Sequence, residues 1–134
     1  MRARGLAVLI VLLSAAPVLP QCNFNPVLSD PFRSTIFDLA IDGNDLWTAT
    51  GYGVSLYDRS VDPPAIEATI PIAGSTRIVR LAGGKVYAAS GNTIAVVRKN
   101  GRALQIERTI DAGAAVNDLI ATTTQLYAAT SKGL

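Results

Sequence analysis

The sequence predicts an all-β fold of small antiparallel sheets, because it repeats every 40 residues without a gap. The dipeptide Leu46-Trp47 recurs as Val86-Tyr87 and again as Leu126-Tyr127. A second segment, residues 66–70, returns at the same displacement as residues 106–110. A strand-rich repeat of this length is typical of β-propeller blades. We therefore expect a partial propeller of about two and a half four-stranded blades, preceded by a signal peptide.

The repeat also predicts how the chain is divided. The expected parts are a signal peptide (1–21), a lead-in segment (22–35), a first blade (36–75), a second blade (76–115) and an incomplete third blade (116–134). Propellers usually have about four to eight blades. The sequence therefore reads as the N-terminal part of a longer propeller.

The first residues have the pattern of an export signal. Arg2 and Arg4 form a basic region, and residues 6–13 form an apolar stretch that is followed by small residues. This stretch is much shorter than the roughly 20 residues that a membrane-spanning helix needs. The pattern therefore favours a signal peptide over a transmembrane anchor.

Cys22 is the only cysteine, so the chain cannot form an intramolecular disulfide. Its place after the apolar stretch resembles a bacterial lipoprotein junction, at which the cysteine is acylated. Gln21 stands where such junctions normally have a small residue. Two interpretations remain open, a lipid anchor at Cys22 and an incidental thiol.

The first repeat unit reads as four strands joined by turns. The expected strands are residues 36–41, 46–50, 54–57 and 66–72. Asp42, Gly43, Asn44 and Asp45 form the first turn, and Gly51-Tyr52-Gly53 forms the second. A longer connection through Pro63-Pro64 leads to the last strand.

The second and third units follow the same order. The expected strands are 78–81, 86–89, 94–97 and 104–110, and then 116–121 and 126–129. Asn100-Gly101 is the most secure turn, because this pair suits the positive φ angles of a two-residue hairpin.

Most strands carry apolar or small residues on both faces, as in Val86-Tyr87-Ala88-Ala89. This pattern predicts sheets that are covered on both sides by neighbouring sheets. Trp47, Tyr87 and Tyr127 share one repeat position, and an alanine follows each ring two residues later. A large ring beside a methyl group allows the side chains of adjacent sheets to interdigitate. We therefore expect the three rings to be largely buried wherever a neighbouring blade exists.

The charges divide between the units. Apart from Arg2 and Arg4, ten bases balance ten acids, which gives no reason to expect a nucleic-acid partner. Residues 36–75 hold six acids and one base, whereas residues 76–115 hold seven bases and two acids. Adjacent units of opposite sign could attract each other, and the simpler interpretation is that these charges are solvated turn residues.

The sequence predicts no catalytic, cofactor-binding or metal-binding residue, and no cofactor. The chain contains no histidine, which removes the commonest general base and excludes a Ser-His-Asp or Cys-His system. Asp42, Asn44 and Asp45 offer oxygen ligands, but Leu46-Trp47 interrupts the spacing of a calcium loop. A hairpin turn is the favoured interpretation of these residues.

Gly51-Tyr52-Gly53 offers two further alternatives. A phosphate-binding loop is disfavoured, because the segment precedes a strand rather than a helix. Tyr52 replaces the Asn92 and Lys132 of the other units. We expect Tyr52 to pack against the fold, with an exposed ring that stacks on a ligand as the alternative.

Residues 92–97 followed by 106–110 resemble the YVTN family of surface-layer and envelope propellers. Residues 45–58 are similar to LVIVD-type repeats and to the sensor propellers of two-component regulators. Arg98 stands where the first unit has Asp58, and the WD-repeat signature is absent, so no functional residue is carried over. The resemblance implies an exported propeller that acts as a binding or structural module.

The expected function is therefore binding rather than catalysis. The expected location is outside the cell or in its envelope, periplasmic or on the outer surface, with membrane contact only through a lipid anchor. The loops of one face would bind a protein, a glycan or a small ligand. Two alternatives remain: an envelope enzyme and a membrane sensor, each with its functional residues beyond residue 134.

Overall fold

The computed structural model describes residues 34–134. The predicted signal peptide, most of the predicted lead-in segment and Cys22 lie outside the described residues. Within this part of the chain there are ten strands and no helix, which confirms the all-β prediction. Consequently none of the described residues belongs to a helix that could cross a membrane.

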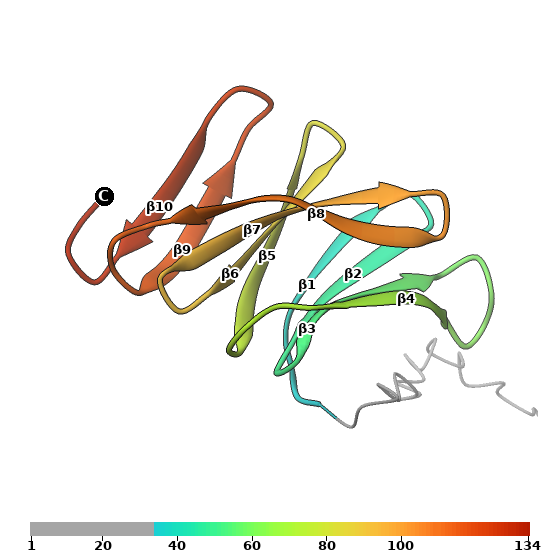
Figure 1. Cartoon of the computed structure of the whole chain (residues 1–134). Coiled ribbons are helices and arrows are strands. Elements are labelled where there is room, and N and C mark those ends of the chain that lie inside the picture. Colours follow the sequence, from blue (N-terminus) through green and yellow to red (C-terminus); the bar gives the residue numbers. More distant parts are fainter. Residues whose placement is uncertain (1–33) are drawn as a thin grey trace, which may run out of the picture.

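Each repeat unit contributes one antiparallel sheet (Figure 1). The first sheet contains β1 (Ile36–Asp42), β2 (Asp45–Thr50), β3 (Gly53–Asp58) and β4 (Ala65–Pro71). The second sheet contains β5 (Thr76–Ala82), β6 (Lys85–Ser90), β7 (Thr93–Asn100) and β8 (Ala103–Asp111). A hairpin of β9 (Val116–Ala121) and β10 (Leu126–Thr130) follows. In both four-stranded sheets the spatial order of the strands is their order in the sequence.

The strand register is the same in each unit. Ala40 pairs with Trp47, Arg80 with Tyr87 and Ile120 with Tyr127, each pair 40 residues after the last. The first strand of every unit also carries an irregularity near its start. The pairing there skips one residue, which is Phe37 in β1, Arg77 in β5 and Asn117 in β9.

The hairpin turn between β7 and β8 differs from the prediction by one residue. Asn100 pairs with Ala103, so the two turn residues are Gly101 and Arg102 rather than Asn100 and Gly101. Gly101 has a φ angle of 61°, which glycine adopts at little cost. Asn100 instead remains in the ladder and extends β7.

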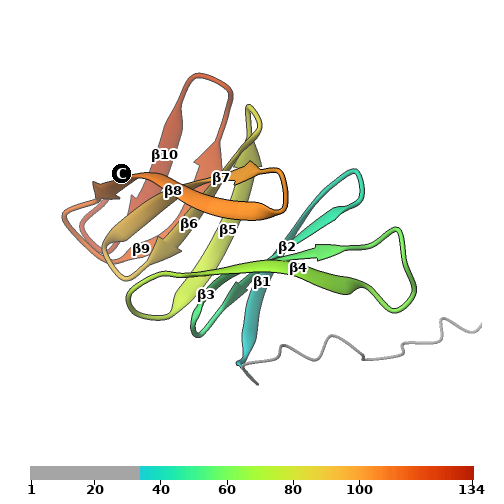
Figure 2. The ribbon, with the colours of Figure 1, turned by 45° about the vertical axis from the view of Figure 1, so that its right-hand side comes forward.

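The sheets pack face to face, so that β1, β5 and β9 lie side by side (Figures 1 and 2). One hydrophobic cluster lies between the two four-stranded sheets and includes Trp47, Leu56, Val79 and Val97. A smaller cluster lies between the second sheet and the hairpin and includes Leu119. The first strand of each unit is therefore the one nearest to the other units.

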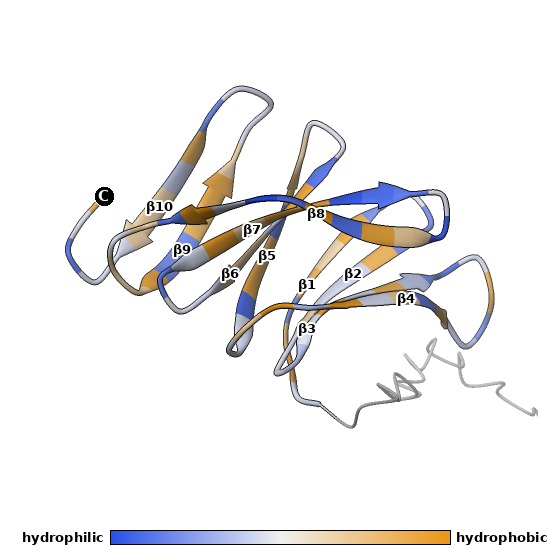
Figure 3. Ribbon diagram, viewed as in Figure 1, coloured by the Kyte–Doolittle hydropathy of each residue, from blue (hydrophilic) through white to orange (hydrophobic). Residues whose placement is uncertain are grey.

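Strands β5, β6 and β7 of the second sheet are buried on both faces, as their sequence predicts, whereas β8 is mostly exposed. Val79 and Ala88 pack toward the first sheet, whereas Ile78 and Ala89 pack toward the hairpin. Figure 3 shows β7 changing from hydrophobic to hydrophilic toward the β7–β8 turn, where Arg98 and Lys99 lie. Water is thus excluded from the middle of the stack and reaches its ends.

The three aligned rings are buried to different degrees. Trp47 exposes 4% of its surface, Tyr87 is half-buried and Tyr127 exposes 41%. The expected burial beside a neighbouring sheet is therefore confirmed for Trp47 and met only in part by Tyr87, and it stays a prediction for Tyr127. Trp47 and Tyr87 lie on the side of their sheets that faces the next unit. Trp47 meets a complete sheet, Tyr87 meets a two-stranded hairpin, and no described sheet covers Tyr127.

Ion pairs connect the acidic first unit to the basic second unit. The Lys99 ammonium lies 2.7 Å from an Asp45 carboxylate oxygen and 3.1 Å from one of Glu67. The hydrogen bond to Asp45 is the main reason that the pKa of Lys99 is raised above its ordinary value. These contacts support attraction between the units over the simpler interpretation of solvated turn charges.

Candidate functional site

The connections that follow even-numbered strands all lie at one end of the stack, because strand direction alternates. These connections are residues 51–52, 72–75, 91–92 and 112–115, and we call this end the loop face. The loops are short, so the strands beneath them fix their positions. The loop face therefore combines loops from the two sheets and from the start of the hairpin.

The largest hollow on the loop face has a volume of about 700 Å³. Its lining comes from the β4–β5 connection, the β6–β7 turn and the β8–β9 connection. Short side chains and glycines dominate, including Gly74, Ser75, Gly91 and Thr93. A volume of this size falls within the range of small-molecule sites.

Residues at one repeat position lie at or beside this hollow. Phe37, Arg77 and Asn117 are the residues that the pairing of β1, β5 and β9 passes over. A bulge redirects a side chain from the regular alternation of a strand. All three side chains are exposed, and Arg77 and Asn117 line the hollow.

Arg77 carries the charge of this site. Its guanidinium carbon lies 5.1 Å from the centre of the Phe37 ring, which is within the range of a cation–π contact. Within residues 34–134, Arg77 forms no ion pair, and it is the only charged side chain that lines the hollow. The hollow is therefore positively charged.

Hydrogen bonds hold the wall of the hollow. Ser90 Oγ donates to the Ala73 carbonyl oxygen at 2.7 Å, and the Val116 amide donates to the Gly91 carbonyl oxygen at 2.8 Å. The Asn92 side-chain amide donates to Asp111 at 3.1 Å. These bonds connect consecutive loops, so the shape of the hollow is set before any ligand arrives.

A second hollow of about 450 Å³ adjoins the first and shares Ala73, Gly74 and Ser75 with it. Tyr52 lines this second hollow and exposes 43% of its surface. The expectation that Tyr52 packs against the fold is therefore wrong. The exposure agrees with the alternative, and the stacking of this ring on a ligand stays a prediction.

The β2–β3 turn does not form a phosphate-binding loop. Thr50 Oγ1 accepts hydrogen bonds from the Tyr52 and Gly53 amides at 3.2 and 3.1 Å. The backbone donors that a phosphate would need are thus already used within the turn, and a strand follows instead of a helix.

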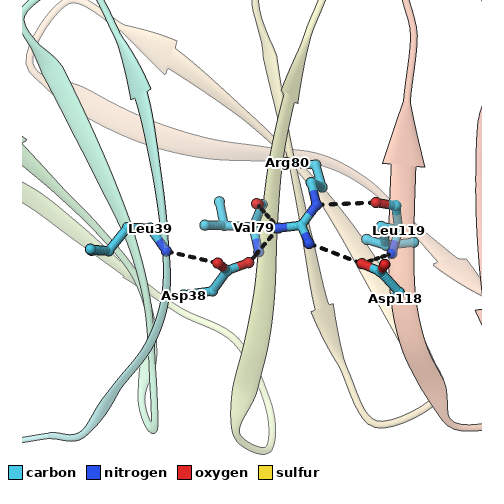
Figure 4. Close-up of polar contacts among 6 residues, drawn as sticks. All are labelled: Asp38, Leu39, Val79, Arg80, Asp118 and Leu119. Carbon is cyan, nitrogen blue, oxygen red and sulfur yellow. Dashed lines mark hydrogen bonds and ion pairs between the residues drawn. The ribbon is translucent and has the colours of Figure 1, made fainter.

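Beneath the loop face, Arg80 connects all three units (Figure 4). It extends from β5 and pairs with Asp38 of β1 at 2.5 Å and with Asp118 of β9 at 2.9 Å. Its Nε atom donates to the Leu119 carbonyl oxygen at 3.1 Å. Asp38 also accepts a hydrogen bond from the Val79 amide at 3.0 Å. This network fixes β1, β5 and β9 relative to one another.

Asp42, Asn44 and Asp45 lie at the opposite end of the stack. Asp42 pairs with Asp45 across Gly43 and Asn44, which confirms the hairpin turn predicted from the sequence. Asp45 accepts a hydrogen bond from Lys99. Among the described residues, no group of three or more acidic or cysteine side chains could hold a metal ion.

The sequence reasoning missed Phe37, Arg77 and Asn117. Their 40-residue spacing can be seen in the sequence, but the interruption of each first strand appears only in the strand pairing. No protein-family model matches the chain, and no curated protein matches it. The site is therefore defined by its own geometry and chemistry.

Proposed function

We propose that the chain forms part of an exported β-propeller, related to the YVTN and LVIVD-type envelope propellers, that binds a ligand at its loop face. Each sheet would be one blade, and β1, β5 and β9 would be the innermost strands around the central axis. The protein would work in the cell envelope or outside the cell, held there by acylated Cys22 or released after cleavage.

The observation that carries this proposal is the alignment of successive units. Their inner strands lie side by side, their registers repeat every 40 residues, and each sheet packs its face against the next. Radial repetition of four-stranded sheets has this arrangement. It also brings the loops of successive units together at one end, which is where the two adjoining hollows lie.

The side chains of the loop face favour binding. They are an arginine, an exposed tyrosine, hydroxyl groups and amides. These groups hold a ligand by charge, stacking and hydrogen bonds. Binding would require little rearrangement, because hydrogen bonds between loops already fix the wall.

Amide chemical shifts measured by NMR would test the proposed binding. The labelled chain would be titrated with a library of oligosaccharides, peptides and small metabolites. We expect shifts that cluster at Gly74, Asn92 and Asn117, with little change at Gly84 and Gly101 at the opposite end. Ligands whose shifts cluster at the opposite end would contradict the proposal.

A reporter fusion would test the proposed export. Residues 1–33 would be placed before a phosphatase that is active only outside the bacterial cytoplasm. We expect activity that is lost when Leu9 is replaced by Arg, because a charge interrupts the apolar stretch. Palmitate labelling of wild type, but not of a Cys22→Ser variant, would identify the lipid anchor. An inactive wild-type fusion would contradict export.

A further inference from the structure

The loop-face hollow offers a single unpaired cation at a fixed place. The stacking of Arg77 on Phe37 leaves the guanidinium without an acidic partner in the described part of the chain. Two other bases of the second unit, by contrast, are paired with acids: Arg80 with Asp38 and Asp118, and Lys99 with Asp45 and Glu67. An arginine fork matches the planar geometry of a carboxylate.

The hollow is larger than a carboxylate alone would need. It holds about 700 Å³ and continues into the hollow of about 450 Å³ beside Tyr52. Ser75, Thr93 and Asn117 supply hydroxyl and amide groups along its wall. The ligand that fits is thus an elongated molecule with many hydroxyl groups and at least one carboxylate.

We infer that this double hollow binds an acidic oligosaccharide, with the carboxylate of one uronic acid residue on Arg77 and a neighbouring sugar ring beside Tyr52. This inference rests on the proposed binding function and specifies its ligand class. A peptide is the less suitable occupant, because extended peptides pair with a free sheet edge. The edge strands that border the larger hollow, β5 and β9, each have a bulge there, at Arg77 and Asn117, which interrupts the regular backbone pairing that such a peptide needs.

The matched ligands are trimannuronate and mannotriose, which differ in carrying a carboxylate or a neutral hydroxymethyl group at each sugar. Calorimetry with the full chain should detect trimannuronate binding and at least about tenfold weaker binding of mannotriose, since an arginine–carboxylate contact is charge-assisted. Added salt should weaken trimannuronate binding. Equal affinity for the two sugars would overturn the inference.

The matched variants are Arg77→Gln and Arg102→Gln. Both remove one positive charge, but Arg102 lies in the β7–β8 turn at the opposite end. We expect Arg77→Gln to weaken trimannuronate binding by about tenfold or more and Arg102→Gln to leave it within about twofold. Equal loss of affinity in the two variants would show that binding depends only on the overall charge of the protein, and this would overturn the inference. Circular dichroism would check that both variants keep the β-sheet spectrum.

Two further ligands separate this inference from the proposed function. If triglutamate bound more tightly than trimannuronate, the assignment of a sugar ligand would be overturned, but the proposed binding at the loop face would stand. If inorganic phosphate displaced trimannuronate completely at equal concentration, the hollow would be a simple anion site. This result would also overturn the assignment of a sugar ligand. The absence of loop-face shifts with every ligand of the library would instead contradict the proposed function itself.

Discussion

Gly53 shows how tightly single residues are constrained where sheet and loop meet. A β-carbon at this position would lie 2.1 Å from the Ile70 carbonyl oxygen and 2.8 Å from the Ile72 amide nitrogen. Ile70 belongs to β4 and Ile72 follows it, so neither atom can move without opening the β3–β4 ladder. Glycine is therefore required here by contact with neighbouring backbone.

We predict that Gly53→Ala lowers the free energy of unfolding by about 2–4 kcal/mol, because backbone strain and a steric clash add together. The control is Gly101→Ala, where φ is 61° but no atom lies within 4 Å of the added β-carbon. This control should lose only about 1–2 kcal/mol. Urea denaturation of both variants would measure the difference, and equal losses would show that the clash is relieved without cost.

At the scale of the strands, polar pairs reinforce the ladders where they reach solvent. Glu107 of β8 lies 2.9 Å from Lys85 of β6 and 2.7 Å from Arg98 of β7. The pKa of Glu107 is held below its ordinary value of 4.5, chiefly by the hydrogen bond from Lys85. One carboxylate thus joins three strands of the second sheet.

We predict that Glu107→Gln makes the protein less stable than wild type at neutral pH and that this difference disappears in acid. A carboxylate with a lowered pKa contributes stability that is present above about pH 4.5 and is lost as the pH falls through the lower, folded value. Denaturation of both proteins between about pH 7 and pH 3 would test this. A constant difference across that range would assign the effect to packing.

Strand positions could be predicted from the sequence because short apolar runs alternate with glycine turns. The expected strands at residues 46–50 and 116–121 agree with β2 and β9 to within one residue. The site could not be predicted, since Phe37, Arg77 and Asn117 gain their role from three strands lying side by side. The pairing of Arg80 with Asp38 and Asp118 likewise depends on packing that no local pattern encodes.

At the scale of the whole molecule, contacts between units fall into an apolar part and a polar part. Apolar clusters fill the space between the sheets, whereas Arg80 connects β1, β5 and β9. Asp38 and Asp118 occupy one repeat position in the first and third units. The second unit has Ile78 there and supplies the arginine, so the charges of the units are complementary.

We predict that Arg80→Met lowers the free energy of unfolding by about 1–3 kcal/mol, because Asp38 is left partly buried without its cation. Amide exchange should rise in β9 and β10 more than in β3, since the hairpin loses its polar connection to β5. Arg108→Met, at an exposed position of β8 without an ion pair in the described part of the chain, is the control. Equal exchange rates in the two variants would contradict a joining role for Arg80.

The bulge at the start of β1, β5 and β9 bears on how the proposed binding specificity could change. A phenylalanine, an arginine and an asparagine occupy this position in successive units, on ladders whose register is otherwise the same. The framework therefore tolerates very different chemistry at the place where we propose that ligands bind. Substitutions confined to these positions can diversify recognition while the stacked scaffold is inherited unaltered.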